Sequence, residues 1–429
     1  MKHTFIIMLL FFSCLLQAQN TESETFAPGK FFSSLQLGGY GEIAMSRNFY
    51  SGNVFRYRTP DNYRNDPAHG RFDLPHVVFF VGYEFGNGWR MNSEIEFEHG
   101  GAEAAMEVEP EEGGEYEQEI ERGGEVTLEQ FWLEKTFSKA LNIRMGHLVV
   151  PVGLTNGNHL PTQFFTVYRP QGESTVLPCT WHETGVSLWG RVSKWRYEAL
   201  FISGLDSELF GSDSWIAGAS ASPYEFKVAN TYAGVLRIDN YSVKGLRLGA
   251  SAYYGYSFKN GIKPAYTDRY KDIKGDVFIG SFDFEYNARN WLARGYADYG
   301  HLGDAQTISI YNRNLPSQSA SPQSDVASAS IAAGVEAGYD IFSAIESMKA
   351  RKQKLYVFGR YEYYDSMYKV PSDILDLKWC ARQVIVGGVN YYPIKEVVLK
   401  AEYSAGLLEK PFINEPAVNI GIAYSGFFR

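Results

Sequence analysis

The chain has 429 residues, 16% of them aromatic, and a mean hydropathy of -0.26. Its formal net charge of -9 argues against a nucleic-acid-binding protein, which needs a basic surface stripe. Many tyrosines and glycines with a polar average are typical of a membrane β-barrel, in which lipid-facing and water-facing residues alternate. A soluble β-sandwich also uses many aromatic residues, so composition leaves that alternative open.

The N-terminus has the layout of an export signal. Lys2 supplies the positive start, an apolar run follows over 5–16, and Ala18 is a small residue at the expected cleavage point. The run is too short for a membrane-spanning helix, which needs roughly 20 residues. We expect residues 1–18 to be a cleaved signal peptide and 19–429 to form one outer-membrane β-barrel domain.

The three cysteines give little structural information. Cys14 lies in the signal, and a lipoprotein signal there is disfavoured because Phe11 and Phe12 precede it. Cys179 and Cys380 remain in the exported chain, and two lone cysteines make no disulfide framework. The two could pair in an oxidising compartment, but we expect both to be free or incidental.

A period of two dominates the rest of the chain. Apolar side chains from Trp89 to Phe97 alternate with polar ones from Arg90 to Glu98, and in a strand the two sets lie on opposite faces. A helix would scatter the glutamates around its axis. The pattern predicts about sixteen strands, an even number as bacterial barrels have, over 33–46, 72–85, 88–98, 126–137, 142–149, 184–192, 194–203, 231–239, 245–258, 276–287, 290–301, 327–340, 354–364, 380–392, 396–405 and 417–428.

The connections between these segments alternate in length. Most of those on one side are short, while the connections on the other side are long and polar, covering 47–71, 99–125, 150–183, 204–230, 259–275, 302–326, 365–379 and 406–416. Short periplasmic turns and long extracellular loops are the layout of an outer-membrane barrel. A sandwich has no reason to keep this alternation. The sequence therefore predicts an all-β, transmembrane antiparallel barrel.

The second long connection is strongly acidic over 103–125. Its carboxylates suit a divalent ion as oxygen ligands, but the ligand spacing and fixed glycine of a dedicated calcium loop are missing. We expect a solvated, mobile loop that sets a negative field at the mouth of the barrel.

The third long connection, 150–183, is too apolar to extend freely into water. It contains Pro151, a Phe164-Phe165 pair, an Arg169-Pro170 pair and several other aromatic residues. A loop of this kind has to pack on another surface, and the barrel interior is the one available. We expect it to fold into the lumen.

Here the chain resembles a known family. The run from Arg144-Met145-Gly146-His147 to Glu183, with its Pro-x-Gly, Arg-Pro and Trp-His-Glu-x-Gly pieces, is similar to the phosphate-selective porin O and P family, in particular its members from Bacteroidetes. The match covers about 130–205. The resemblance implies a sixteen-stranded, trimeric porin whose third loop narrows a pore for ions such as phosphate.

Four residues are candidates for the pore constriction: Arg169, His159, Glu173 and His182. Arg169 presents five donors and a fixed charge to a passing anion. The alternative is that it pairs with Glu173 or with a glutamate of the wall and holds the loop in place.

Inward-facing charges are expected along the strands. The candidates are Arg90, Arg144, Arg196, Arg247, Arg294, Arg360, Glu94 and Glu96. A row of arginines would favour anions, but the acidic residues share the same faces, so we expect a lumen of mixed charge. The preference between anions and cations stays open.

The sequence offers no catalytic motif. Neither a Gly-x-Ser-x-Gly nor a His-Glu-x-x-His motif is present, and we expect no enzyme activity, metal site or cofactor. The leading hypothesis is a passive porin in the outer membrane of a Gram-negative bacterium, a homotrimer that contacts outer-membrane lipid and passes small hydrophilic solutes or ions. The alternative is a plugged barrel whose loops bind a ligand or a host surface.

Overall fold

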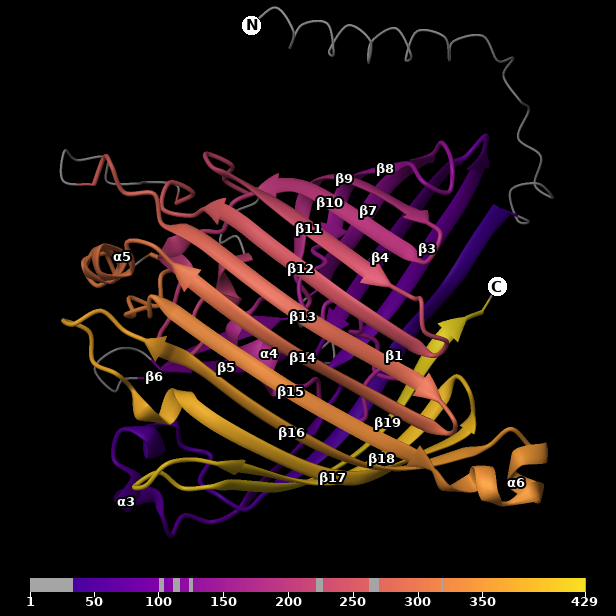
Figure 1. The fold of residues 1–429 in the computed structure, drawn as a ribbon. Helices are drawn as coiled ribbons and strands as arrows, with labels where there is room; N and C mark the ends of the chain where they lie inside the picture. Colours follow the sequence, from indigo (N-terminus) through magenta and orange to yellow (C-terminus); the bar gives the residue numbers. More distant parts are fainter. Residues whose placement is uncertain are drawn as a thin grey trace, which may run out of the picture.

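The computed structural model describes residues 34–99, 104–110, 116–122, 126–220, 227–261, 270–317 and 319–428. Its main feature is a closed antiparallel β-barrel of sixteen strands (Figure 1). The barrel closes where β1 (Leu35–Asn48) pairs with β19 (Glu415–Phe427), in a register that runs from Gly38 opposite Phe427 to Asn48 opposite Ala417. The predicted fold class is confirmed.

The other barrel strands follow in chain order, each antiparallel to its neighbours. They are β3 (His76–Gly86), β4 (Trp89–Glu98), β7 (Val126–Thr136), β8 (Asn142–Val149), β9 (His182–Val192), β10 (Trp195–Ser203), β11 (Tyr232–Asn240), β12 (Leu246–Tyr256), β13 (Asp276–Ala288), β14 (Trp291–Leu302), β15 (Ala329–Asp340), β16 (Lys354–Lys369), β17 (Ala381–Ile394) and β18 (Val397–Leu407). Apart from the segment predicted over 72–85, the predicted segments coincide with these strands and differ only at their ends. The largest difference is in β16, which continues to Lys369 instead of ending at 364.

A short strand, β2 (His69–Asp73), belongs to the same position in the barrel as β3. Both pair with β1, β2 near its loop end and β3 near its start. The two are separated by Leu74 and Pro75. Because proline has no backbone N–H to donate, the ladder is interrupted there. The single segment predicted over 72–85 is therefore split and begins earlier.

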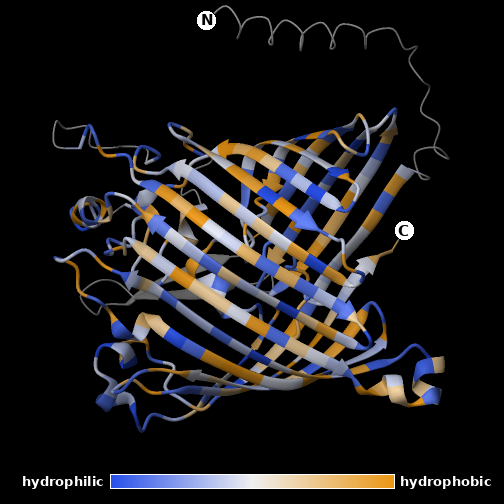
Figure 2. Ribbon diagram, viewed as in Figure 1, coloured by the Kyte–Doolittle hydropathy of each residue, from blue (hydrophilic) through white to orange (hydrophobic). Residues whose placement is uncertain are grey.

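The barrel wall shows the predicted alternation of hydropathy. Figure 2 shows polar and apolar residues following one another along the strands. Large apolar side chains such as Phe201, Leu236 and Ile420 are exposed on the outside, whereas Glu198, Asp239 and other charged residues of the same strands are buried inside. An apolar outer band facing lipid and a polar interior are what a membrane barrel requires.

One end of the barrel carries tight turns. Between β3 and β4 the chain turns at Asn87 and Gly88, both with positive φ. A side chain at Gly88 would come within 2.6 Å of the Thr136 carbonyl oxygen, so the turn needs glycine. The other end carries the long connections. This end is called the loop end below, and the opposite one the turn end.

Short helical segments lie between the strands. They are η1 (Val54–Tyr57), α3 (Pro60–Tyr63), α4 (Gln171–Val176), η2 (Ser207–Leu209), η3 (Ala217–Ser220), α5 (Ala305–Asn312), η4 (Ile341–Ala344), α6 (Glu346–Ala350) and η5 (Lys378–Cys380). Among the described residues, no helix is long and apolar enough to cross a membrane.

The acidic second connection, which we expect to be solvated and mobile, contains secondary structure that the sequence pattern did not assign. It contains a hairpin of β5 (Ala104–Pro110) and β6 (Tyr116–Arg122), with Met106 opposite Ile120. Apolar residues alternate with glutamates in both segments, and this period-two pattern favours strand pairing. The expected signal peptide, 1–18, lies outside the described residues.

Candidate pore and its constriction

The third connection, 150–181, lies inside the barrel and is called the third loop below. Its apolar side chains are buried, among them Val152, Phe165 and Trp181. Phe165 stacks on Phe358 of β16 with ring centroids 5.0 Å apart. Burying these side chains against the inner wall removes apolar surface from water and holds the loop in the lumen.

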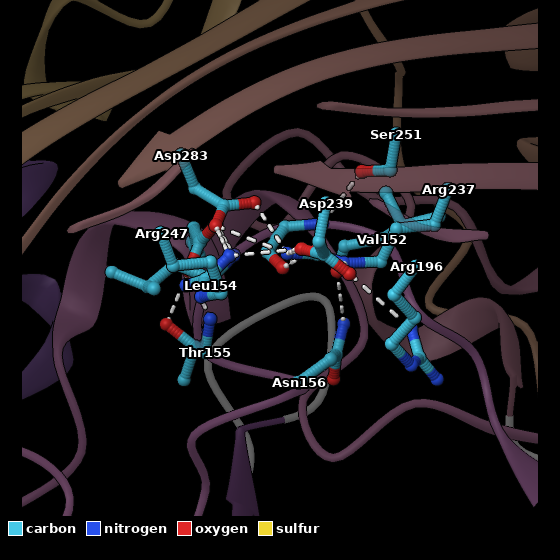
Figure 3. Close-up of polar contacts among 12 residues, drawn as sticks. Val152, Leu154, Thr155, Asn156, Arg196, Arg237, Asp239, Arg247, Ser251 and Asp283 are labelled. Carbon is cyan, nitrogen blue, oxygen red and sulfur yellow. Dashed lines mark hydrogen bonds and ion pairs between the residues drawn. The ribbon is translucent and has the colours of Figure 1, made fainter. Parts of the chain in front are cut away.

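The first half of the loop is anchored on the wall at β11 to β13. The Gly153 N–H donates to the Ser251 hydroxyl at 3.2 Å, and the Gly153 carbonyl accepts from the Arg237 guanidinium at 3.1 Å. Figure 3 shows Arg237 and Arg247 among the carboxylates of Asp239 and Asp283, next to this part of the loop. Buried charges of opposite sign are thus paired, which buried ions require.

The middle of the loop is anchored on β17 and β18. The Lys400 ammonium donates to the carbonyl oxygens of Phe164 and Thr166 at 3.1 and 2.7 Å. The Asn390 amide donates to the Phe165 carbonyl, and the Val167 N–H donates to the Glu402 carboxylate, both at 2.9 Å. These bonds satisfy backbone groups that would otherwise be buried without partners.

Glu173 joins two parts of the third loop. Its carboxylate accepts the backbone N–H groups of Leu154 and Thr155, both at 2.7 Å, and the Thr155 hydroxyl. The side chain is fully buried, and this burial raises the pKa of Glu173. Its carboxylate is thus turned toward the Leu154 and Thr155 backbone of the loop.

The wall opposite Arg169 is acidic. Glu42 of β1, Glu94 and Glu96 of β4, and Glu129 of β7 point inward. A β-bulge where β4 pairs with β7 turns Glu129 toward the interior beside Gln130, so two consecutive residues face the same side. The sequence reading missed Glu129, because strict alternation assigns only one of these neighbours to the interior.

Three of the four predicted constriction residues meet at this acidic wall. The His159 imidazole lies 3.7 Å from the Glu94 carboxylate, and the His182 imidazole lies 3.2 Å from that of Glu129. Burial by itself lowers the pKa of Arg169, but nearby Tyr40, Glu129 and other acidic groups raise it above its ordinary value. Among the described residues, Arg169 forms no ion pair with Glu173, and its buried Nε and Nη2 atoms have no hydrogen-bond partner although Glu42, Glu96 and Glu129 are near enough to affect its pKa.

The predicted lumen arginines all lie beside carboxylates. Glu134 is fully buried and pairs with both Arg90 and Arg144 at 2.6 and 2.9 Å. The remaining arginine partners are Glu198 and Asp239 for Arg196, Asp239 and Asp283 for Arg247, Glu336 for Arg294, and Glu336 and Glu362 for Arg360. Each predicted arginine therefore has a carboxylate partner, although Glu134, Asp239 and Asp283 are each shared by more than one arginine.

Two cavities lie on either side of the constriction. The larger, about 400 Å³, opens on the turn side of the third loop and is lined by His159, Gln130 and five arginines, including Arg191 and Arg237. The smaller, about 80 Å³, lies on the loop side and is lined by Arg71, Tyr168 and other polar residues. Glu94, Glu96 and Glu129 of the acidic wall are only 2 to 3% exposed.

The small inward residues of the wall do not line open space but pack closely against other groups. The chain places Gly249, Ser251 and Gly421 on the inner face, where small residues could leave an open lumen. A side chain at Gly421 would instead come within 2.9 Å of Val167. Ser251 accepts the hydrogen bond from Gly153. Gly421 and Ser251 therefore make room for the third loop, whereas Gly249 makes room for the Arg237, Arg247 and Asp283 side chains of the wall.

Comparison with known sequences does not assign the chain to a family. No family model matches the chain. A protein from Aquifex aeolicus (strain VF5), described as uncharacterized, is 29% identical over 373 residues, which are 86% of this chain and 75% of the relative.

Solved structures are similar in fold. The outer-membrane channel DcaP of Acinetobacter baumannii has a TM-score of 0.54 at 12% identity, with 91% of this chain and 97% of that chain covered. OprB of Pseudomonas putida has a TM-score of 0.53 at 10% identity, covering 92% and 95%. An anion-selective porin from Comamonas acidovorans has a TM-score of 0.50 at 10% identity, covering 92% and 99%. At these identities the likeness shows the porin fold.

Proposed function

We propose that the chain is a porin of the outer membrane of a Gram-negative bacterium, through which small hydrophilic solutes and ions diffuse passively. The observation that carries this proposal is the third loop inside the barrel, where His159 lies against Glu94 of the wall and His182, the first residue after the loop, lies against Glu129. Charged groups that line a narrow passage select solutes by size and charge. The porin fold of the solved relatives supports the same function and location.

We further propose a weak preference for cations at this constriction. Glu42, Glu94, Glu96 and Glu129 outnumber Arg169 there. The positive field of the arginines in the turn-side cavity is weakened, because carboxylates pair with four of the five. A dense row of unpaired cationic groups would instead favour anions such as phosphate. The resemblance to phosphate-selective porins leaves anion passage as the competing outcome.

Assembly and export belong to the same proposal. Residues 1–18 would be removed as a signal peptide and 19–429 would form the barrel domain. A homotrimer is proposed from the family resemblance alone. No catalytic role is assigned to any residue.

The test is the reversal potential of the purified barrel in a planar bilayer under a KCl gradient. We expect conductance steps with a cation-selective potential. Arg169→Gln should increase the cation preference and Glu96→Gln should decrease it, while Arg289→Gln, at an exposed turn position, should leave it unchanged. An anion-selective reversal potential, together with a conductance that phosphate blocks, would contradict the proposed preference for cations.

The same bilayer experiment also tests whether the barrel conducts at all. Folded wild-type protein that gives no conductance steps would contradict a porin. It would favour the alternative of a plugged barrel whose outer loops bind a ligand, since the constriction side chains are nearly buried. Arg169→Gln separates the two cases, because it affects ion flow in a pore and has no effect on binding at the outer loops.

A further inference from the structure

Three strands place a histidine between glutamates near the loop end of the barrel. His76 is the first residue of β3 and lies directly opposite Glu98 of β4, while Val78 lies opposite Glu96. On its other side β3 pairs with β1, where Gly41 is opposite Val77 and Glu42 follows. Side chains opposite one another in an antiparallel pair are about 5 Å apart, so these groups share one patch of the inner face.

The His76 ring is oriented by Glu42. Its Nδ1 atom lies 2.7 Å from the Glu42 carboxylate. This leaves Nε2 directed at the Glu96 carboxylate, 3.8 Å away. A carboxylate that holds one ring nitrogen, so that the other nitrogen can bind a metal, is the usual arrangement around metal-binding histidines.

Glu96 carries an oxygen without a partner. Its Oε1 atom is buried and has no hydrogen-bond partner among the described residues, and the side chain is 97% buried. The same oxygen is the one that faces His76 Nε2. A buried carboxylate oxygen left without a donor is costly, and a bound cation would satisfy it.

The spacing of the three groups fits one ion. One ligand atom each from His76, Glu96 and Glu98 lie within 4.8 Å of one another. Metal–ligand distances of about 2.1 Å in a tetrahedral site put ligand atoms about 3.4 Å apart, so only small side-chain rotations are needed. His76 and Glu98 are partly exposed, which gives the ion a path from the loop end.

We propose that His76, Glu96 and Glu98 bind a divalent transition-metal ion of the zinc type, with Glu42 orienting the histidine. One imidazole and two carboxylates favour such an ion over calcium or magnesium, which prefer oxygen ligands alone. Three protein ligands leave a fourth position for water. The bound ion places positive charge on the acidic wall that faces Arg169.

Isothermal calorimetry of the detergent-folded wild-type barrel with zinc chloride tests this site directly. The reading does not depend on conductance, so it separates this inference from the proposed pore. We expect one saturable zinc site that His76→Ala removes and that Glu42→Gln weakens about 10- to 100-fold. His301→Ala removes an exposed histidine of β14 and should leave binding unchanged. Circular dichroism shows that each variant is folded.

Zinc that binds to the acidic connection over 103–125 should bind wild type and His76→Ala equally. The difference between their two isotherms therefore reports binding at the proposed site. Zinc isotherms that are the same for wild type, His76→Ala and Glu98→Gln would overturn the proposal. So would magnesium binding as tight as zinc, because it would indicate an all-oxygen site without the histidine. If His76→Ala does not fold, Glu98→Gln and Glu42→Gln carry the test alone.

Discussion

Lys400 offers a way to release the third loop without altering the constriction itself. It is buried on β18 and makes two of the four hydrogen bonds that join the wall to residues 164–167. Lys400→Met keeps the shape of the side chain and removes both bonds. We expect the loop to undock more often and the pore to widen when it does.

The magnitude follows from the two carbonyl oxygens that lose their donor. Leaving a buried acceptor unsatisfied costs about 1–3 kcal/mol. The lower end applies to each oxygen here, because removing a buried ammonium also removes its desolvation penalty. The docked loop is then destabilised by about 2 kcal/mol, which raises the undocked population about 30-fold, since 1.4 kcal/mol corresponds to a factor of ten.

Single-channel recording measures this population as time spent in a state of larger conductance. Lys395→Met is the matched control, because Lys395 is an exposed lysine at the turn before β18. If Lys400→Met and Lys395→Met give the same conductance levels and the same current noise, the wall bonds of Lys400 do not hold the loop.

Three further predictions concern stability and reactivity. Arg237→Met removes one partner of two buried aspartates that keep Arg247, and it should lower the free energy of unfolding by about 1.5–3 kcal/mol in urea titrations. Exposed Arg289→Met should change it by less than about 0.5 kcal/mol. Gly421→Val forces a side chain against the third loop and should cost about 1–3 kcal/mol in the same assay, whereas Gly387→Ala, which meets no atom within 4 Å, should be nearly neutral. Burial raises the pKa of Cys380 to about 12, so its thiol stays protonated at pH 8. Cys380 should therefore resist iodoacetamide in the folded barrel and react quickly in urea. Rapid labelling of the folded protein would contradict this prediction.

The strands and their order could be predicted from the sequence. Alternation such as that from Trp89 to Glu98 depends only on side chains pointing to opposite faces, which is a local property of a strand. The interruption at Pro75 was missed, because a single proline was outweighed by the apolar residues around it. The hairpin over 104–122 was missed because its many glutamates were read as a solvated loop.

The constriction could be predicted only in part. An apolar loop with nowhere else to pack indicated that 150–183 enters the barrel, and Arg169, His159 and His182 do lie together at its acidic wall. Glu173 was placed in the same set because it is close in sequence, yet it turns back onto Leu154 and Thr155. The direction of a loop side chain depends on the path of the loop, which sequence spacing does not specify.

Local periodicity alone determines that this chain forms a barrel with a polar interior and a lipid-facing exterior, because strand geometry converts each pair of neighbours into one inward and one outward residue. Only the tertiary structure decides which inward charges meet. Lys400 and Phe164 are far apart in the chain, and docking of the third loop inside the barrel brings them into contact. Pairing of β3 with β1 and β4 places His76 beside Glu42 and opposite Glu98. Electrostatic partners act through distances in space, so the charge at the constriction follows from the fold and not from the composition of any one strand.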